Sequence, residues 1–393
     1  MEFKFSLEDE TFRRDLRQFV KDELPSDWEG GGRWPEETDW DLTREMRKKL
    51  ADKGWLTMHW PEEYGGQARS IMEQTVYREE MTYWGVPGTD LGTGAIGWVG
   101  PVLMISGTEE QKSEHLPPIA NAERYWCTLY SEPGSGSDLA SLQTSAVRDG
   151  DDYIINGQKI WTSSGHIADW GWLAARTDPD APKHRGISLF MLDMKSQGVT
   201  VRPIVNMAGS HEFNEVYFDN VRVPKGNLVG EENRGWYTLA VALDFERSGV
   251  GYSASARRTL ETLVKYAKET ERNGKPLSED PIVRHKLAER KIEIEVSRWL
   301  SYQVAWMQSQ DMVPNAEASM SKLFGTELTQ KVASTGMDIL GMTGQLSKGS
   351  KWAPLQGYIQ RLSLSSVSST IAAGTSEIQR DIIARRGLGL PRA

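Results

Sequence analysis

A glutamate on an apolar helical stripe is the first residue in this sequence that could do chemistry. Glu246 falls in phase with Leu243 and Val250 at three- and four-residue spacing, which predicts a helix whose apolar face carries a carboxylate. No lysine or arginine stands three or four positions away, so no salt bridge within the helix accounts for the acid. Desolvation raises the pKa of a carboxyl group toward the range that a general base needs near neutral pH. A long-range ion pair with a distant cation is the alternative, and both interpretations stay open.

Two further segments combine small, hydroxyl and aromatic residues. The segment 130–138 reads YSEPGSGSD, and the segment 156–163 reads NGQKIWTS. A Gly/Ser-rich turn alone is a weak signal, because most such stretches are ordinary loops. Taken without its flanking motif, Trp161 would be interpreted as a core aromatic, since the chain holds 15 tryptophans. The pair Asn156-Gly157 predicts a two-residue hairpin turn, because both residues tolerate positive φ.

Composition narrows the classes of function. The chain has 393 residues, 38% of them hydrophobic, and a formal net charge of -9 without any basic block, which argues against nucleic acid as a partner. The longest uncharged stretch, 91–107, is too Gly-rich and too short for a membrane span, so we expect no membrane association. A single cysteine, Cys127, excludes an internal disulfide and a metal site built from several thiolates, and it favours a reducing, cytoplasmic compartment. The six histidines show no metal-ligand spacing, so we expect no metal. The first residues have neither an apolar signal core nor transit-peptide character.

The elements that must position these residues follow the order helices, strands, helices. Apolar residues recur at helical spacing from about Ser6 to Asn121, short β-branched and aromatic runs fill about Trp126 to Pro224, and helical spacing returns from about Gly235 to Arg386. The strands are expected to form an antiparallel sheet or barrel. The predicted domains are 1–121, a helical N-terminal domain; 122–234, a central β domain; and 235–393, a C-terminal helical bundle.

The two central segments together resemble the signature of the acyl-CoA dehydrogenase family of flavoproteins. Further agreement along the chain comes from GW and PEEYGG within 54–66, VRVP at 221–224 and GTSEIQR at 374–380. The resemblance covers essentially the whole chain. It implies an α+β fold with an N-terminal helical domain, a central β-barrel-like domain and a C-terminal four-helix bundle.

The resemblance implies FAD as cofactor and places its ring on the β domain. A flavin needs an apolar slot, donors near N5 and small residues at its pyrophosphate. Ser131 would lie near N5, with Trp161 flanking the ring, and Ser137 would also contact the acyl-CoA. The full set implied for this part of the cofactor site is Leu129, Ser131, Gly136, Ser137, Trp161 and Ser163.

The resemblance also implies that part of each FAD site comes from a neighbouring subunit, in a homotetramer or a heterotetramer. Arg272 stands where the family places an arginine on the partner's pyrophosphate. The other positions of this kind are Asp338 and Gly341, and the C-terminal loop adds Thr375 and Glu377. Gly274-Lys275 and Met342 depart from the family's commoner residues at these places.

The family's reaction is α,β-dehydrogenation of an acyl-CoA thioester, and it needs a carboxylate as base. Many members place a glutamate just before the Gly-Thr-Ser of the C-terminal loop, where this chain has Ala373. A smaller group, which includes isovaleryl-CoA, long-chain and bacterial steroid side-chain enzymes, has a helical motif like LDFER, present here at 243–247. The resemblance thus implies Glu246 as base, with Asp244 and Arg247 at the CoA moiety.

Alternatives remain for the function and for the electron acceptor. A non-catalytic subunit of a hetero-oligomeric acyl-CoA dehydrogenase is the alternative function, since Ala373 and Gly274-Lys275 depart from the common pattern. Electron-transfer flavoprotein is the electron acceptor that the family implies, and an oxidase that uses oxygen directly is not excluded. Ala372 and Ala373 remove bulk from the loop that would face the acyl pocket, which favours a branched or large acyl group.

Overall fold

The computed structural model describes residues 4–26, 28, 40–89, 94–243 and 249–391. Its contacts divide the chain into two compact units. Unit 1 comprises Met1–Pro35, Ser70–Val86 and Arg247–Ala393, and unit 2 comprises Glu36–Arg69 and Pro87–Glu246. The first and last stretches of the sequence therefore belong to one unit, and the strands belong to the other.

Unit 2 is built around a mixed sheet. Its strand order is β6-β7-β3-β2-β4-β5-β8, with β1 beside β4. Most pairs are antiparallel, but β4 pairs parallel with β1 and with β2, so the expectation of a purely antiparallel sheet was wrong. The strands are β1 (Trp126–Leu129), β2 (Ser145–Asp149), β3 (Asp152–Ser163), β4 (Trp170–Arg176), β5 (Ile187–Asp193), β6 (Val199–Val205), β7 (His211–Pro224) and β8 (Leu228–Val229).

The hairpin turn lies elsewhere than predicted. Asn156 and Gly157 are inside β3, and the turn between β2 and β3 is Gly150-Asp151, where Gly150 has φ +63°. Gly157 serves close packing instead, because a Cβ there would come within 2.6 Å of the Thr144 hydroxyl. A register shift in the β3–β7 ladder between Ile155 and Gly157 accommodates this approach.

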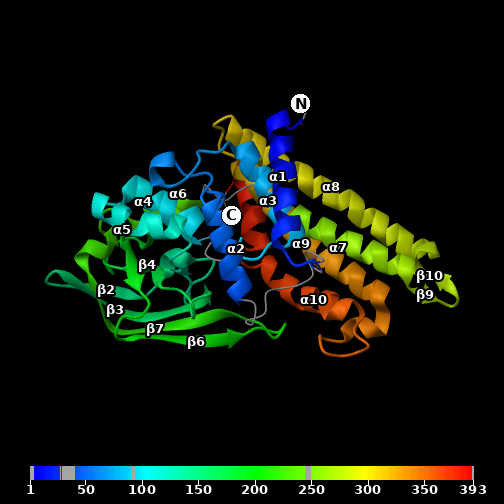
Figure 1. Ribbon diagram of the computed structural model, residues 1–393. Helices are drawn as coiled ribbons and strands as arrows, with labels where there is room; N and C mark the ends of the chain where they lie inside the picture. Colours follow the sequence, from blue (N-terminus) through cyan, green and yellow to red (C-terminus); the bar gives the residue numbers. More distant parts are fainter. Residues whose placement is uncertain (1–3, 27, 29–39, 90–93, 244–248, 392–393) are drawn as a thin grey trace. The chain divides into compact units, whose positions relative to one another are not determined.

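Unit 2 also contains helices, which lie beside its sheet. The helices α4 (Gly100–Ser106), α5 (Glu109–Ala120) and α6 (Gly235–Leu243) gather on one side of the sheet (Figure 1), and α2 (Trp40–Asp52) also belongs to this unit. Inward side chains of alternating strand residues form the sheet's core, with Leu129, Ile155 and Phe190 fully buried. This core fixes the strand ends from which the candidate site is built.

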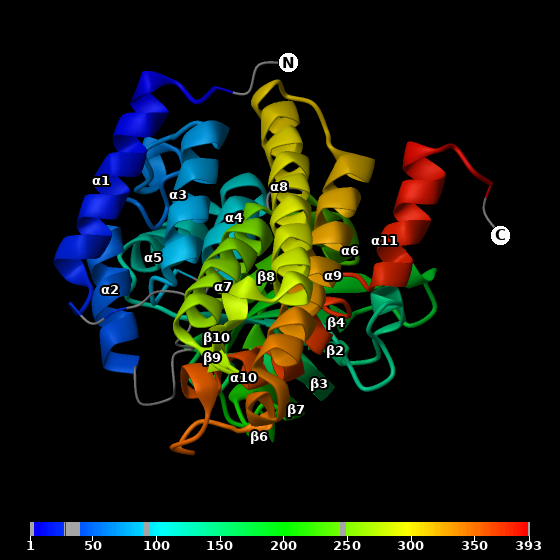
Figure 2. The same ribbon diagram turned by 90° about the vertical axis from the view of Figure 1, so that its right-hand side faces the viewer.

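Unit 1 is a helical bundle. The long helices α7 (Val250–Glu269), α8 (Pro281–Ser309) and α9 (Asn315–Leu340) run side by side (Figures 1 and 2). With α10 (Tyr358–Ser369) they share one apolar core. The unit also contains α1 (Leu7–Glu23), α3 (Ile71–Trp84), α11 (Ser376–Ile382) and the hairpin of β9 (Glu271–Arg272) and β10 (Lys275–Pro276). The predicted fold class, with helical first and last parts around a β middle, is confirmed.

Buried ion pairs explain why α1 and α3 group with the C-terminal helices. Arg13 of α1 donates to Glu79 of α3 at 2.7 Å and to Glu80 at 2.8 Å. Arg298 of α8 donates to Glu79 at 2.8 Å, and the Tyr302 hydroxyl donates to the same carboxylate at 2.9 Å. A buried carboxylate is stable only with such partners, so these contacts hold α1, α3 and α8 together.

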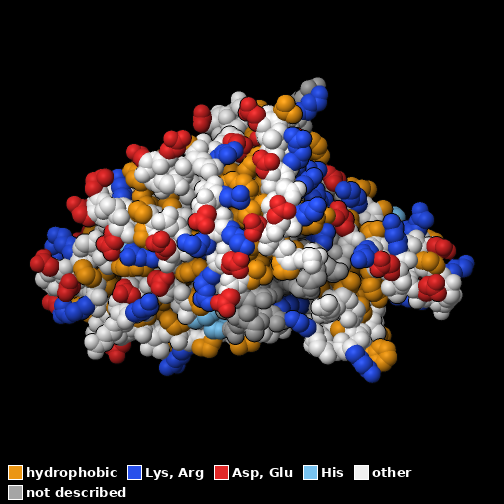
Figure 3. Space-filling model, in the orientation of Figure 1, with side chains coloured by type: hydrophobic (Ala, Val, Ile, Leu, Met, Phe, Trp, Pro, Cys, Tyr) orange, Lys and Arg blue, Asp and Glu red, His pale blue; other side chains and the backbone are white. Residues whose placement is uncertain are grey.

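Acidic and basic side chains lie interspersed on the face of the molecule drawn in Figure 3. Within the described ranges, no helix has the length and apolar character that crossing a membrane would require.

Candidate functional site

The ring-contact residues implied for the β domain lie on two adjacent segments. The Ile160 amide donates to the Ser131 carbonyl at 2.9 Å, which ties the segment after β1 to the end of β3. Ser131 is partly exposed and Ser163 is exposed, so both hydroxyls can face a ligand. Leu129 is 0% exposed and lies in the sheet core, so neither its side chain nor its main chain reaches the surface.

Trp161 is the most unusual residue of this part of the site. Its side chain is 58% exposed and meets the Phe213 ring edge-to-face at 6.2 Å, so Trp161 is not a core aromatic. Its φ is +61°, and the β3 register shifts between Lys159 and Thr162. A non-glycine residue in this conformation costs on the order of 1–3 kcal/mol and persists where the surroundings enforce it, most often at functional sites. The bulge turns the indole outward.

The Gly/Ser-rich turn has room for a ligand. A Cβ added to Gly136 would meet no atom within 4 Å, so packing within the chain does not require glycine there. Ser137 is exposed, whereas buried Ser135 donates to the carbonyls of Asp138 at 3.0 Å and Leu139 at 3.3 Å. Ser135 therefore fixes the turn, and Gly136 and Ser137 stay open toward solvent.

A cavity of about 520 Å³ adjoins this turn. It is lined by Glu132, Pro133, Gly134, Ser135, Ser141, Gln143, Thr144, Gly157 and Gln158. The lining combines the turn after β1, the stretch that leads into β2, and β3. The cavity therefore lies beside the two segments that carry the implied flavin contacts.

A buried ion pair underlies both segments and was missed by the sequence analysis. The Lys159 ammonium donates to Glu132 Oε1 at 2.8 Å and to the Tyr130 carbonyl at 3.0 Å. The Glu132 carboxylate also accepts the amides of Gln143 at 2.6 Å and Thr144 at 2.8 Å. Although burial favours the neutral acid, Lys159 and these amides hold the pKa of Glu132 below its usual value. The pair fixes Ser131, which lies between its two anchored neighbours.

A signal for this pair exists in the sequence. Tyr153, Ile155 and Lys159 occupy positions of the same parity along β3, and the first two face the core. A lysine in phase with core residues indicates a buried cation, which requires a carboxylate nearby.

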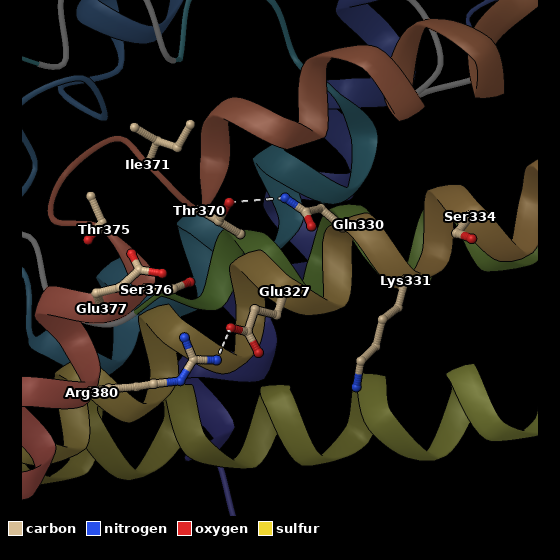
Figure 4. Close-up of a pocket in the computed structure, with 10 residues that line it drawn as sticks. All are labelled: Glu327, Gln330, Lys331, Ser334, Thr370, Ile371, Thr375, Ser376, Glu377 and Arg380. Carbon is tan, nitrogen blue, oxygen red and sulfur yellow. Dashed lines mark hydrogen bonds and ion pairs between the residues drawn. The ribbon is translucent and has the colours of Figure 1, made fainter.

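The described part of unit 1 contains a second pocket, of about 550 Å³ (Figure 4). Thr375 and Glu377, the two residues of the C-terminal loop for which the resemblance implies contact with FAD, are among its lining residues. The Gln330 and Thr370 side chains point toward each other across it, 3.0 Å apart, and Arg380 pairs with Glu327 at 2.5 Å. Its full lining is Glu327, Gln330, Lys331, Ser334, Thr370, Ile371, Thr375, Ser376, Glu377 and Arg380.

The implied inter-subunit contacts also lie together in unit 1. Arg272 donates to the Ile339 carbonyl at 3.1 Å, and a Cβ on Gly341 would lie 3.8 Å from the Arg272 guanidinium. Asp338 accepts from Lys286 at 2.5 Å. Met342 is 83% exposed at the end of the same segment. The hairpin β9–β10 and the end of α9 thus present one surface.

The residues implied for catalysis are described only in part. Glu246, Asp244 and Arg247 lie outside the described residues. Ala373 is exposed on the C-terminal loop with φ +52°, and it has no group that could accept a proton. Within the described ranges, no cluster of His, Cys, Asp and Glu is arranged to bind a metal ion.

Comparison with known families decides the assignment. Family models for the acyl-CoA dehydrogenase N-terminal, middle and C-terminal domains match residues 6–123, 127–221 and 233–388. The chain belongs to the acyl-CoA dehydrogenase family. This is a family of flavoprotein oxidoreductases of lipid metabolism, and the chain is an oxidoreductase of this kind.

Two relatives and two solved structures illustrate the match. Acyl-CoA dehydrogenase FadE26 of Mycobacterium tuberculosis is 40% identical over 89% of this chain and 88% of its own. Acyl-CoA dehydrogenase IpdE1 of the same species is 34% identical over 98% of both chains. The Tcur3481-Tcur3483 steroid acyl-CoA dehydrogenase has a TM-score of 0.89 at 38% identity, covering 100% of both chains. The ChsE4-ChsE5 complex from Mycobacterium tuberculosis has a TM-score of 0.89 at 37% identity with the same coverage.

Proposed function

We propose that this chain is an FAD-dependent acyl-CoA dehydrogenase of the cytoplasm that converts an acyl-CoA thioester to the trans-2-enoyl-CoA. The observation that carries the proposal is Trp161, an exposed indole held in a strained backbone conformation beside Ser131. Exposure alone does not distinguish Trp161 from other surface indoles such as Trp352, but the strained backbone that holds its ring outward favours a role in binding a ligand.

The residues of the β domain fit a flavin. The indole of Trp161 offers an apolar wall, and the hydroxyls of Ser131 and Ser163 are accessible donors. The free space at Gly136 suits the approach of a pyrophosphate to the main chain. Bound FAD would accept a hydride from the β-carbon of the acyl group.

The chain's own contribution to the chemistry is to bind the thioester and to remove a proton. We assign the removal of the pro-R α-proton to the carboxylate of Glu246, because its helical motif matches the members that carry the base there. Ser137, Asp244 and Arg247 would bind the CoA thioester and orient the α-carbon toward this carboxylate. Electron-transfer flavoprotein is the proposed acceptor of the electrons.

We propose a branched or bulky acyl group as substrate. Ala372 and Ala373 leave the C-terminal loop without large side chains. Relatives are named a steroid acyl-CoA dehydrogenase and, at 30% identity, cyclohexane-1-carbonyl-CoA dehydrogenase of Geobacter metallireducens. Incubation with straight, branched, cyclic and steroid acyl-CoAs and an artificial electron acceptor tests the proposal, with the enoyl-CoA detected by mass. Product from the bulky thioesters is expected, and no product from any member of the panel would contradict it.

Removing the indole of Trp161 should weaken FAD retention. Trp161→Ala opens one wall of the proposed ring site, and a packed aromatic of this size contributes a few kcal/mol, so we expect the dissociation constant for FAD to rise about a hundredfold. Fluorescence titration of the deflavinated protein measures it. Trp352→Ala, at another indole that is 70% exposed, is the matched control and should leave FAD affinity unchanged. Equal affinities in wild type and Trp161→Ala would contradict the assignment.

FAD retention should also depend on assembly. We propose a homotetramer in which Arg272, Asp338 and Gly341 contact the cofactor of a neighbouring chain, because these residues form one exposed surface in unit 1. Light scattering combined with the flavin absorbance of each peak measures oligomer size and FAD content together. A monomer that holds one FAD per chain would contradict this arrangement.

A non-catalytic subunit of a hetero-oligomer is the second candidate. Two of the similar solved structures pair two differently named chains, Tcur3481 with Tcur3483 and ChsE4 with ChsE5. Ala373, which lacks a proton acceptor, is the feature of this chain that favours it. In that case, the chain would bind little FAD alone and would acquire it only with a second, different chain.

A further inference from the structure

One lysine bridges the two ends of the loop between α10 and α11. The Lys322 ammonium, carried by α9, donates to the Ser369 carbonyl at 3.2 Å and to the Gly374 carbonyl at 2.7 Å. Ser369 is the last residue of α10, and Gly374 stands just before Thr375, the N-cap of α11. A single cation therefore connects the point where the chain leaves one helix with the point where it starts the next.

Both carbonyls are suited to a cation. The last carbonyls of a helix lack partners within the helix and carry the negative end of its dipole, so the ammonium stabilises the end of α10. The side chain of Lys322 is partly buried, and this burial lowers its pKa. A partly desolvated ammonium gains more from hydrogen bonds to carbonyls than an ammonium in water does.

Two glutamines complete the support of the loop. Gln379 of α11 donates to the carbonyls of Ala373 and Gly374, at 3.3 Å each. Gln330 of α9 donates to the Thr370 hydroxyl at 3.0 Å, a hydrogen bond that Figure 4 draws as a dashed line.

The loop needs such external support. Ala373 and Gly374 have φ of +52° and +87°, a left-handed pair of which the first is costly for a residue with a Cβ. The Ser376 amide bonds the Thr370 carbonyl at 2.9 Å and closes the loop at its base. The loop's shape is thus imposed mainly from α9 and α11.

We propose that Lys322 is a positioning residue for the dehydrogenation: it holds residues 370–374 in the shape that presents Thr375 and Glu377 to FAD and Ala372 and Ala373 to the acyl group. The inference rests on the proposed function for those loop residues. Lys322 itself acts through the main chain of the loop and does not touch the reacting atoms.

Substitutions of Lys322 that keep a long side chain but change its hydrogen-bond donors test the role. Lys322→Met removes every donor, whereas Lys322→Arg keeps a cation with several N–H groups that can reach both carbonyls. Lys291→Met is the matched control, because Lys291 also lies on a long helix of unit 1 but pairs with Glu295, four residues further along the same helix. If Lys322→Met does not fold, Lys322→Gln, with a shorter neutral donor, replaces it.

Hydrogen exchange measured by mass spectrometry reads the loop directly. We expect peptides that cover 369–376 to exchange about tenfold to a hundredfold faster in Lys322→Met, the factor for losing a hydrogen bond from a charged donor. Peptides from the middle of α8 should be unchanged, and Lys322→Arg should restore most of the protection. Unchanged exchange in Lys322→Met would overturn the proposal.

Kinetics and FAD affinity then separate positioning from mere stability. In Lys322→Met, kcat should fall about tenfold or more with a smaller change in KM and a near-normal melting temperature, and Lys322→Arg should recover kcat. A freed loop with wild-type kcat and KM would overturn the role. If the wild type dehydrogenates no acyl-CoA, the proposed function fails by itself. The dissociation constant for FAD then tests Lys322 separately. A constant that is higher in Lys322→Met and returns to the wild-type value in Lys322→Arg supports the role, and a constant unchanged in Lys322→Met overturns it.

Discussion

Glu246→Gln should abolish turnover while flavin content and thermal stability remain near those of the wild type. Glutamine keeps the size and polarity of the side chain but cannot accept a proton. Loss of a general base costs about a hundredfold to ten-thousandfold in rate, and more where the proton leaves carbon and water cannot substitute. If Glu246 were only the partner of a distant cation, the change would instead lower stability by about 1–3 kcal/mol and leave the chemistry fast.

Anaerobic stopped-flow measurement of flavin bleaching by a good acyl-CoA distinguishes these cases, with the melting temperature of each variant beside it. Glu269→Gln, at an exposed acid near the end of α7, is the control and should bleach at the wild-type rate. A Glu246→Gln variant that melts early but bleaches normally would remove Glu246 as the base and leave the helical motif as a structural feature.

Lys159→Met should be the most destabilising single change in the β domain. It leaves the Glu132 carboxylate buried without its cation, and breaking a buried pair from one side costs about 3–5 kcal/mol. For a unit of this size that corresponds to a melting temperature roughly 10 °C lower. FAD retention should fall as well, because the pair anchors the residues on both sides of Ser131.

Differential scanning fluorimetry with and without added FAD measures this effect. Lys183→Met is the control, since Lys183 pairs with Asp138 at 2.7 Å but both side chains are exposed, and such pairs contribute about 1 kcal/mol or less. The double variant Lys159→Met/Glu132→Gln should recover part of the loss, because it removes the unpaired charge. A Lys159→Met protein as stable as the control would show that the ion pair does not hold the site together.

Much of the fold could be predicted because apolar spacing reports directly on which face of an element is buried. The helical segment expected from about Ser6 begins with α1 at Leu7, capped by Ser6, and the β segment expected from about Trp126 begins with β1 at Trp126. The prediction of a hairpin turn at Asn156-Gly157 was wrong because the residue types that suit a turn also suit a close approach of two strands. Only the proximity of Thr144, which lies 13 residues before Gly157 in the sequence, distinguishes the two.

The candidate site shows the same division between local and long-range information. Lys159 was missed because a lysine is usually exposed, and its partner Glu132 lies 27 residues away in the sequence. Lys322 carries no motif of its own, and its role follows from two carbonyls 47 and 52 residues distant. Trp161 was identified through its motif, but its exposure and positive φ became known only from the structure.

The central claim is that this chain, by itself, forms a working FAD site for an acyl-CoA. The most direct test is the visible absorption spectrum of the purified chain, recorded anaerobically before and after addition of a bulky acyl-CoA. We predict a yellow protein with close to one FAD per chain whose flavin absorbance bleaches on addition of the thioester, with formation of the enoyl-CoA. A colourless chain that becomes yellow only when a second, different chain is added would contradict the account and identify this chain as the non-catalytic partner.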